Sequence, residues 1–414
     1  MKRIVFTTSV KIPEDRSFGN FFEYAMPHPI FKLDFHYPAV GLRFLKENIP
    51  DIEIMEGPSW EDYEAILKEG IDILGISFYT YQIPIVERMI EMARKYRVGE
   101  IWGGNYGILT PGIEEKFDRS FKGYAEGDVY ETLYKRPFLD PIRHPVMIVK
   151  ETTPLFPLVQ GRMGLLFTHR GCRFRCKFCQ TPVFAPQISA LPYEEVEKAV
   201  REYHKRGVRV MLIIEEDFKP HQNKRLLELF SELGMVWMAQ TRLDYYSGRV
   251  GEYVKTGFIG GLIGIEALSD HNLSFLNKYL TRKKIIETLK EMWEYKLFVQ
   301  GTYMFGYENE NEESIRETIE ELINLPLLVC HYFVLTPLPQ TELFTYIDKK
   351  YGIHKNDWSR FDCFHLVWNH PHITPERMDR LINYARQKNW SPQRYFQYLA
   401  RIWEKIRFVV ELKK

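Results

Sequence analysis

Three cysteines close together are the residues of this sequence best suited to chemistry. Cys172, Cys176 and Cys179 form a C-x3-C-x2-C run. Three thiolates at this spacing can hold three irons of a 4Fe–4S cluster, and because no fourth cysteine lies nearby, one iron would stay open to a ligand. A zinc site completed by a distant histidine, or cysteines buried at this spacing by chance, are the alternatives. Basic side chains around the run are expected to favour the thiolate form: Arg170, Arg173, Arg175 and Lys177.

The elements that must position this run are apolar strands alternating with amphipathic helices. Between residues 164 and 336 six such βα units follow one another, which predicts a partial barrel of the TIM type rather than a closed ring of eight. The cysteine run directly follows the first of these strands. The expected strands are 164–168, 208–214, 235–240, 258–265, 298–305 and 328–336, and the expected helices include 193–204, 223–233, 282–295 and 312–324.

A separate α/β unit is expected before the barrel. Five short apolar segments with intervening helices predict a doubly wound, Rossmann-like parallel sheet, and such sheets bind ligands beyond the carboxyl ends of their strands. Clustered prolines then predict a linker, and the pattern near the C-terminus is helical and aromatic. The expected division is 1–135 (Rossmann-like domain), 136–161 (linker), 162–345 (partial barrel) and 346–414 (helical C-terminal domain).

From the cysteine run onward, the segment 164–341 resembles the radical S-adenosylmethionine (SAM) superfamily. The resemblance implies that the open iron chelates the amino and carboxylate groups of SAM, and that reduction of the cluster releases a 5′-deoxyadenosyl radical. It places Phe178 near the adenine, although a core phenylalanine is the plainer interpretation. It also implies SAM contacts from residues at the ends of later strands: Glu215, Glu216, Gln240, Arg242 and Glu266.

Two of these assignments have specific alternatives or departures. The acidic turn Glu215–Asp217 could equally be a solvated surface turn, whereas Arg242 is expected to pair with the methionine carboxylate. The turn Thr336–Thr341 resembles the superfamily's P-x-P-G-T turn but carries Gln340 in place of the glycine.

The first domain resembles the cobalamin-binding domain that precedes many radical SAM barrels. The resemblance rests on small or polar residues at successive strand ends. The implied cobalamin contacts are Thr8, Ser77, Tyr79, Tyr81, Gly103, Gly104, Asn105, Glu126 and Gly127. A degenerate module that binds no corrin is the alternative.

One departure from the cobalamin carriers concerns the ligand below cobalt. Residues 8–16 lack the D-x-H-x-x-G histidine of free-standing carriers, and His28 and His36 come later without the motif. Cobalamin is therefore expected to bind with its base displaced and no histidine on cobalt. Tyr79, Tyr81 or Gln82 would face that lower side.

Composition narrows the class of protein further. The 414 residues carry a formal net charge of +1 without a long Lys/Arg run, so nucleic-acid binding is not expected. Five cysteines without a disulfide framework indicate a cytoplasmic protein, and no apolar stretch approaches the length of a membrane span. Aromatic residues near the C-terminus could line a substrate groove or form an ordinary core: Trp358, Trp368, Trp390, Tyr395 and Tyr398.

Together the two resemblances imply a cobalamin-dependent radical SAM methyltransferase. It would methylate an unactivated carbon of a protein residue, a lipid or a metabolite through methylcobalamin, with electrons from a donor such as ferredoxin or flavodoxin. A non-methylating rearrangement, cyclisation or coupling enzyme, and a non-catalytic corrinoid or iron–sulfur carrier, are the alternatives. A methylthiotransferase is disfavoured because no cysteine precedes Cys172.

Overall fold

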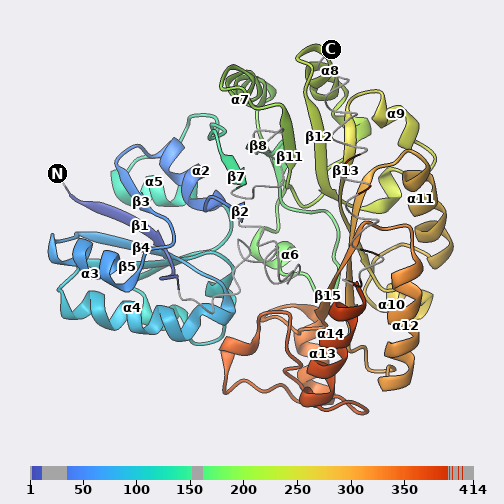
Figure 1. Ribbon diagram of the computed structural model, residues 1–414. Coiled ribbons are helices and arrows are strands. Elements are labelled where there is room, and N and C mark those ends of the chain that lie inside the picture. The colour runs from blue at the N-terminus through green and yellow to red at the C-terminus, as the bar shows by residue number, and fades with distance from the viewer. Residues whose placement is uncertain are drawn as a thin grey trace.

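Two sheets lie side by side in the structure, a computed structural model that describes residues 2–11, 35–151 and 162–389 together with 391, 394, 400 and 403. Figure 1 shows the N-terminal sheet on the left, the barrel sheet on the right, and the short helix α6 (Thr181–Phe184) between them. The predicted fold class, a Rossmann-like sheet followed by a partial barrel and C-terminal helices, is confirmed.

The first sheet contains five strands in the order β3-β1-β4-β5-β6, and every pair is parallel. Both faces are covered, since α2 and α5 pack on one face and α3 and α4 on the other. The strands are β1 (Ile4–Thr8), β3 (Ile52–Met55), β4 (Ile73–Ser77), β5 (Glu100–Gly104) and β6 (Arg119–Phe121); the helices are α2 (Val40–Asn48), α3 (Trp60–Lys68), α4 (Ile83–Lys95) and α5 (Glu126–Tyr134).

Local signals explain where these helices begin. Ser59 accepts a hydrogen bond from the backbone amide of Asp62, whose side chain accepts one from the Ser59 amide, so a capping box starts α3. Pro84 lies in the first turn of α4, where its missing N–H costs nothing. Apolar residues at helical spacing then bury one face of α4 against the sheet.

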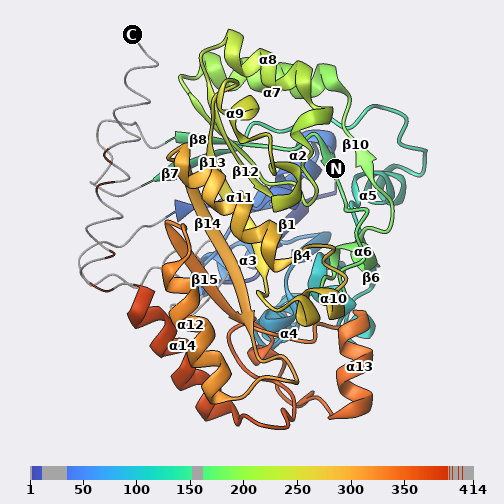
Figure 2. The same ribbon diagram turned by 90° about the vertical axis from the view of Figure 1, so that its right-hand side faces the viewer.

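The second sheet is an open barrel. Its strand order is β15-β14-β13-β12-β11-β8-β7-β2, and the six strands from β8 to β15 pair in parallel. These six are the expected ones: β8 (Arg162–Leu166), β11 (Val210–Ile213), β12 (Val236–Thr241), β13 (Phe258–Glu266), β14 (Phe298–Phe305) and β15 (Val329–Val334). Figure 2 shows the helices that cover the outside of this sheet: α7 (Tyr193–Lys205), α8 (Lys224–Glu232), α9 (Val250–Val254), α10 (Asp270–Phe275), α11 (Arg282–Glu294) and α12 (Glu312–Asn324).

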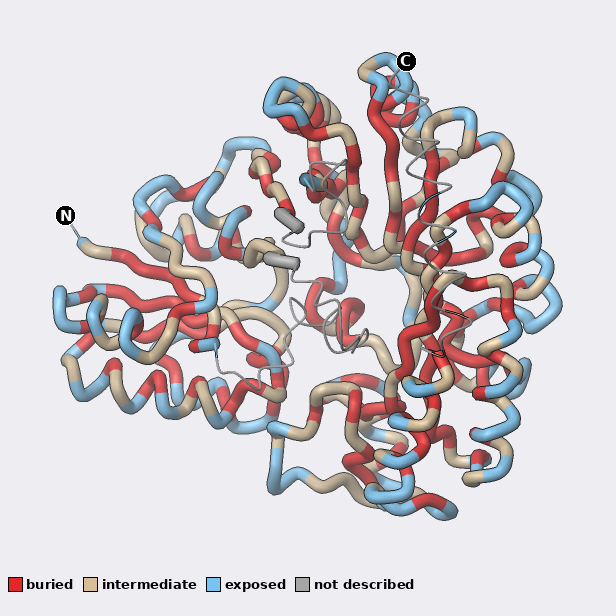
Figure 3. The backbone as a smooth tube through the Cα atoms, viewed as in Figure 1, coloured by how far each residue is buried: buried red, intermediate tan, exposed pale blue. Residues whose placement is uncertain are grey.

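Burial alternates along the barrel strands because successive side chains point to opposite faces. The residues that pack beneath the outer helices are fully buried, as Figure 3 shows in red. Their inward neighbours are only half-buried, among them Leu212, Gln240, Leu262, Gln300 and Thr302. The inner face is therefore less tightly covered than the outer face.

The expected linker carries structure of its own. β7 (Ile148–Glu151) pairs antiparallel with β8, and β2 (Phe35–His36) pairs antiparallel with β7. The edge of the barrel sheet thus contains a strand from the first third of the chain. The boundaries at 135 and 162 stay a prediction, but the segment between them contributes a strand to the second sheet.

The C-terminal region contacts both sheets. It contains α13 (Glu342–Lys350), the short helix η6 (Trp358–Arg360) and α14 (Pro375–Asn389). Trp368 is fully buried and its Nε1 donates to the Leu335 carbonyl oxygen at 3.2 Å, so this residue belongs to the ordinary core. Trp358 packs instead against the core of the first sheet. Trp390, Tyr395 and Tyr398 lie outside the described residues. Across the part of the chain that the structure describes, no helix is long and apolar enough to cross a membrane.

Candidate active site

The cysteine loop leaves the carboxyl end of β8 and is held by its neighbours. Gly171 has a φ of +93°, and a Cβ there would come within 2.8 Å of the Gln187 carbonyl oxygen, so only glycine fits. The amide of Lys177 donates to Leu276 at 3.1 Å, and the Cys176 Sγ lies 3.8 Å from the Asn277 carbonyl oxygen. The loop therefore rests on the segment that follows α10.

The three cysteines are the candidate ligands of a cluster, with a zinc ion as the alternative. Cys172, Cys176 and Cys179 are all free and half-buried on one loop. Among the described residues no three His, Cys, Asp or Glu side chains lie close enough together to hold one metal ion. A zinc ion needs its ligand sulfurs about 2.3 Å from one centre, whereas a four-iron cluster takes each thiolate at a different iron.

The expected role of the neighbouring basic residues is not what the structure shows. Burial raises the pKa of all three thiols, that of Cys172 to about 12. The cations that oppose this effect at Cys176 are Lys278, in the segment after α10, and Arg242, directly after β12. The basic residues of the loop have other partners: Arg170 with Glu126, Arg173 with Tyr245 and Asp217, Arg175 with the Pro182 carbonyl, and Lys177 with Glu342.

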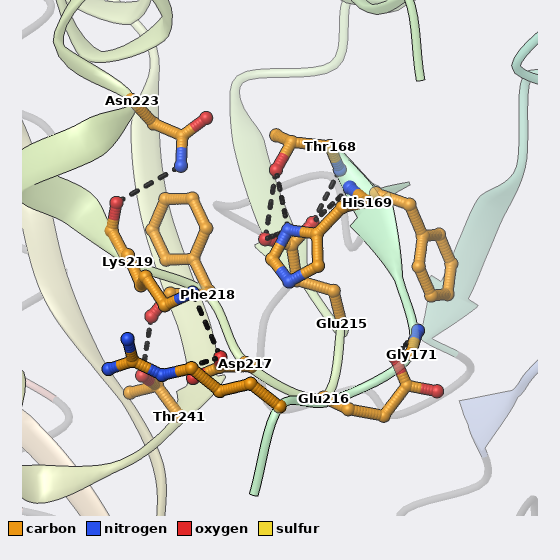
Figure 4. A network of polar contacts seen from close by, with 12 residues as sticks. Thr168, His169, Gly171, Glu215, Glu216, Asp217, Phe218, Lys219, Asn223 and Thr241 are labelled. Carbon is orange, nitrogen blue, oxygen red and sulfur yellow. Dashed lines mark hydrogen bonds and ion pairs between the residues drawn. The ribbon is translucent and has the colours of Figure 1, made fainter. Parts of the chain in front are cut away.

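Glu215 anchors the start of the cysteine loop (Figure 4). Its carboxylate is fully buried and accepts hydrogen bonds from the Thr168 amide, the Thr168 hydroxyl at 2.9 Å and the His169 amide at 3.1 Å. The His169 Nδ1 lies 3.0 Å from the same group. Burial alone would lower the pKa of His169, but the Glu215 carboxylate outweighs it and raises that pKa. The alternative of a solvated acidic turn is therefore wrong for Glu215.

Asp217, on the same turn, is also fully buried. It accepts a hydrogen bond from the Tyr245 hydroxyl at 2.5 Å and pairs with Lys219 at 3.0 Å, while Arg173 of the cysteine loop lies 3.6 Å away. Glu216 is half-buried, and its Oε2 accepts the Gly171 amide at 3.2 Å. The whole acidic turn thus braces the cysteine loop.

Arg242 and Glu266 lie on the far side of the same loop. The Arg242 guanidinium stacks 3.8 Å from the centre of the Phe174 ring and donates to the Lys278 carbonyl at 2.6 Å and to Asp244 at 3.1 Å. Lys278 in turn pairs with Glu266 at 3.1 Å, with both side chains largely buried. This ion pair is the nearest charged contact of Glu266.

Glu266 sits at an irregularity in its strand. The register between β13 and β14 shifts between Gly264 and Glu266, and Glu266 has a φ of +66°. Such bulges re-aim a side chain at the end of a strand, and here the carboxylate also accepts a hydrogen bond from Thr302 at 3.2 Å. A Cβ at Gly264 would clash with the Glu266 carboxylate at 2.4 Å, so the glycine leaves room for this arrangement.

The remaining expected SAM contacts lie in the same region. Phe178 is half-buried and packs against the main core next to Cys179, and Gln240 is half-buried on the inner face of β12. The structure thus places four of the expected residues against the cysteine loop, namely Glu215, Glu216, Arg242 and Glu266, whereas the contacts of all six with SAM stay a prediction. Sequence reasoning missed Thr168 and His169, which stand at a strand end directly before the cysteines, and Lys278, for which no local pattern gives a signal.

Glycines at the carboxyl ends of the first sheet differ in how much space surrounds them. A Cβ at Gly103 would come 2.7 Å from the Phe117 ring, so this glycine is required by the domain's own core. A Cβ at Gly104 would meet only the Phe121 carbonyl oxygen at 3.7 Å, and one at Gly127 would meet nothing within 4 Å. Backbone at Gly104 and Gly127 is therefore open to a ligand, which fits a cobalamin site.

Other expected cobalamin contacts flank these glycines. Ser77 ends β4 half-buried, and the Thr8 hydroxyl bonds to the Ser9 carbonyl at 3.2 Å and accepts the Gly57 amide at 2.8 Å. Asn105 has a φ of +73° and its side chain accepts the Tyr106 amide at 2.9 Å.

Tyrosines next to these strand ends lie parallel to one another. Tyr79 is 38% exposed, and its ring lies parallel to those of Tyr81 and Tyr106, at centroid distances of 6.2 and 6.1 Å. A partly exposed ring beside open backbone suits a flat macrocycle. Gln82 is buried and its side chain accepts the Tyr79 amide at 2.9 Å, which turns it toward its own loop.

Glu126 has a partner that the sequence did not reveal. Its side chain is 4% exposed and accepts a hydrogen bond at 2.6 Å from Arg170, two residues before Cys172. The contact of Glu126 with cobalamin stays a prediction, but its carboxylate already forms an ion pair with Arg170 of the barrel. His36 lies in β2 on the barrel sheet, and His28 and residues 12–34 lie outside the described residues.

Comparison with known proteins gives the class. Residues 166–322 match the model of the radical SAM superfamily. An uncharacterized methyltransferase of Pyrococcus horikoshii is 24% identical over 84% of this chain and 86% of its own length. Bacteriochlorophyllide d C-12(1)-methyltransferase of Chlorobaculum tepidum is 24% identical over 50% of this chain and 47% of its own length.

Two solved structures share the fold across the domains. The radical SAM methyltransferase TsrM of Kitasatospora setae, with tryptophan and a SAM analogue bound, gives a TM-score of 0.62 at 13% identity, over 84% of this chain and 76% of that one. The cobalamin-dependent radical SAM enzyme OxsB, with aqua-cobalamin and SAM bound, gives 0.63 at 13% identity, over 99% of this chain and 72% of that one.

This chain is therefore an enzyme with a radical SAM domain, and the predicted resemblance is confirmed. Its fold is shared with the solved structures of TsrM and OxsB.

Proposed function

We propose that this enzyme is a cobalamin-dependent radical SAM methyltransferase acting on an unactivated carbon. One observation carries the proposal: the carboxyl edge of the first sheet touches the cysteine loop directly. The Tyr106 ring stacks 4.3 Å from that of Phe184 in α6, and its hydroxyl lies 3.1 Å from that of Thr181, which follows Cys179 by two positions. A ligand at the strand ends of the first sheet would thus face the cluster.

The residues present fit the three cofactors. Bound together, the cluster, SAM and cobalamin supply a carbon-centred radical and a methyl group, which is chemistry that side chains cannot perform. Cys172, Cys176 and Cys179 would hold the cluster. Around the same loop, Arg242 and the pair of Glu266 with Lys278 offer charged groups of both signs for the methionine and nucleoside parts of SAM.

On the opposite side the first sheet would hold cobalamin. The open backbone at Gly104 and Gly127 admits close approach of a ligand, and the partly exposed Tyr79 supplies a flat apolar surface. We propose that cobalamin binds with its base displaced and without a protein imidazole on cobalt. In the described part of the first sheet and its helices no histidine is present to take that place.

The acceptor would lie between the two cofactors, against the inner face of the barrel. Apart from half-buried Gln300 and Thr302, that face carries a neutral imidazole, because burial lowers the pKa of His331 to about 4. His331 Nε2 lies 2.7 Å from the Gln300 amide oxygen. A protein residue, a lipid and a small metabolite are the acceptor classes to compare, and a one-electron donor such as ferredoxin or flavodoxin is the proposed partner.

The test is anaerobic reconstitution with cluster, cobalamin and methyl-labelled SAM. The proposed reaction yields S-adenosylhomocysteine and 5′-deoxyadenosine together, and the label appears on the acceptor by mass spectrometry. A rearranging or cyclising enzyme would yield 5′-deoxyadenosine without S-adenosylhomocysteine, and a carrier would yield neither.

A methylthiotransferase is the second function that the comparisons suggest. A protein named as a methylthiotransferase of Methanocaldococcus jannaschii is 26% identical over 67% of this chain and 69% of its own length. Against this function, the chain has no cysteine before Cys172. A gain of sulfur together with the methyl group in the labelled product would establish it instead.

A further inference from the structure

We propose that Arg170 and Glu126 form an interdomain latch that fixes the spacing between the first sheet and the cysteine loop. The inference rests on the proposed function, because that spacing matters only if the two sides hold reacting cofactors. It assigns both residues a positioning role rather than a contact with substrate. The latch would couple radical formation on one side to methyl transfer on the other.

Arg170 is buried among residues of the first sheet and its helices. The side chains of Arg170 and Glu126 are each only 4% exposed, and the nitrogen–oxygen distance is 2.6 Å. The guanidinium carbon lies 4.7 Å from the Phe44 ring centre and 4.4 Å from the Tyr124 ring centre. Phe44, Tyr124 and Glu126 all belong to the first sheet and its helices, whereas Arg170 lies two positions before Cys172.

This ion pair contributes to the placement of the two segments rather than to the stability of the fold. A buried ion pair gains little net free energy over apolar residues of the same volume, because both charges lose their hydration. Arg170 Nε also lacks a hydrogen-bond partner among the described residues, an added cost of burial. A charged pair held at one distance between planar rings does, however, define one relative placement of the two segments.

A second contact braces the same loop from the next residue. The Tyr124 hydroxyl donates to Glu216 Oε1 at 2.8 Å, and the other oxygen of Glu216 accepts the Gly171 amide at 3.2 Å. Gly123 brings this segment close to α6, since a Cβ there would lie 3.1 Å from the Phe184 carbonyl oxygen. Residues 123–126 therefore contact Arg170 before the cysteines and α6 after them.

The departure from the superfamily turn adds a third contact between the domains. Gln340 keeps a left-handed φ of +62°, the conformation that a glycine would adopt without strain. Its side-chain amide donates to the Leu109 carbonyl oxygen at 2.9 Å, across to the first sheet. The glutamine thus adopts a backbone conformation that is unfavourable for a side chain, but it makes an interdomain hydrogen bond that a glycine cannot make.

The consequence of loosening the latch follows from the geometry of transfer reactions. A misplacement of about 1 Å can cost roughly a hundredfold in rate when two reacting groups must meet. Cleavage of SAM at the cluster needs only the barrel, so it should continue when the first sheet shifts. The enzyme would then release 5′-deoxyadenosine without transferring a methyl group.

The test compares Glu126→Gln with Glu87→Gln in the reconstituted enzyme. Glu87 makes an exposed ion pair with Lys116 in the same domain, so it is a matched control. Glu126→Gln should raise the share of 5′-deoxyadenosine formed without S-adenosylhomocysteine by about tenfold or more. It should also change the dipolar coupling between the reduced cluster and cobalt(II) in pulsed electron paramagnetic resonance, and Glu87→Gln should change neither.

The double variant Arg170→Met/Glu126→Gln separates positioning from stability. It leaves no uncompensated buried charge, so its stability should recover toward that of the wild type. Its uncoupled turnover and altered dipolar coupling should persist, because the geometric constraint is gone. The latch would be overturned if the double variant had the product ratio and the dipolar coupling of the wild type. It would also be overturned if Glu126→Gln changed neither quantity.

Failure of the proposed function would look different. A wild-type enzyme that forms no S-adenosylhomocysteine refutes methyl transfer but not the contact itself. Amide hydrogen exchange of residues 168–172 in the cluster-loaded enzyme then decides: faster exchange in Glu126→Gln than in Glu87→Gln supports the latch, and equal exchange overturns it.

Discussion

Replacing Glu215 by glutamine should loosen the loop that carries the three cysteines. Glu215 accepts three hydrogen bonds from Thr168 and His169, two of them from backbone amides, and pairs with the His169 ring. The oxygen of a glutamine can still accept from the backbone amides of Thr168 and His169, while its NH2 group faces the Thr168 hydroxyl and the His169 ring. The bonds are then retained, but they are no longer charge-assisted.

The magnitude follows from that loss of charge. A hydrogen bond to a charged group contributes about 1.5–3 kcal/mol and a neutral one about 1 kcal/mol, so three bonds lose roughly 3 kcal/mol in total. Since about 1.4 kcal/mol corresponds to tenfold, the loop should leave its cluster-binding conformation about a hundredfold more often. Anaerobic release of iron to a chelator, followed by the loss of visible absorbance, should accelerate accordingly.

The control and the pH dependence make this prediction refutable. Glu202→Gln removes an exposed pair with Arg206 on α7 and should leave iron release unchanged. The raised pKa of His169 means that its ion pair with Glu215 stabilises the fold fully below the ordinary value near 6.5 and less as pH rises through the folded value. The effect of Glu215→Gln should therefore be largest at acid pH. Iron release at the wild-type rate would refute the anchoring role.

Three further predictions follow from the same structure. Burial raises the pKa of Glu310 to about 7, and one of its oxygens accepts both the Gly306 and Tyr307 amides, so Glu310→Gln keeps both bonds and removes the ionisation. As pH rises from 4.5 through 7, the wild type should lose stability relative to this variant, by about 3 kcal/mol at most. The difference between their thermal midpoints should therefore grow between pH 5 and pH 8. A constant difference would mean that Glu310 has an ordinary pKa. Gly104→Val should leave the thermal midpoint nearly unchanged but weaken cobalamin binding at least tenfold, as measured by absorption titration. Gly103→Ala should instead lower the midpoint, because its Cβ meets a ring of the domain core. Wild-type cobalamin affinity in Gly104→Val would show that this glycine does not line the site. The electron paramagnetic resonance spectrum of bound cobalt(II) should lack the splitting of a nitrogen ligand, and a histidine splitting would contradict the base-displaced binding mode.

Elements with a strong local pattern could be predicted from the sequence. The six barrel strands follow from apolar runs between amphipathic helices. That the three cysteines share one loop follows from their spacing, whereas their role as cluster ligands stays a prediction. The start of α3 is likewise determined locally, by the capping box between Ser59 and Asp62. In each case the information lies within a few residues, where periodicity and hydrogen-bonding chemistry determine the local structure.

Contacts between distant segments could not be predicted in the same way. Glu126 and Arg170 are separated by 44 positions, and neither has a neighbour in sequence that reveals the other. The pairing of Phe35–His36 with β7 involves a strand of two residues, which leaves no periodicity to detect. Gln340 was recognisable as a departure from the superfamily turn, but its hydrogen bond to Leu109 appears only when both domains are in place.

The most direct test of the proposed function does not require the methyl acceptor to be known. The reconstituted enzyme, with its cobalamin reduced, is mixed with methyl-labelled SAM, and the corrin and the nucleoside products are examined by mass spectrometry. Cobalamin-dependent methyl transfer predicts one labelled methyl group on each bound cobalamin and an equal amount of S-adenosylhomocysteine. Formation of 5′-deoxyadenosine with an unlabelled corrin and no S-adenosylhomocysteine would contradict it.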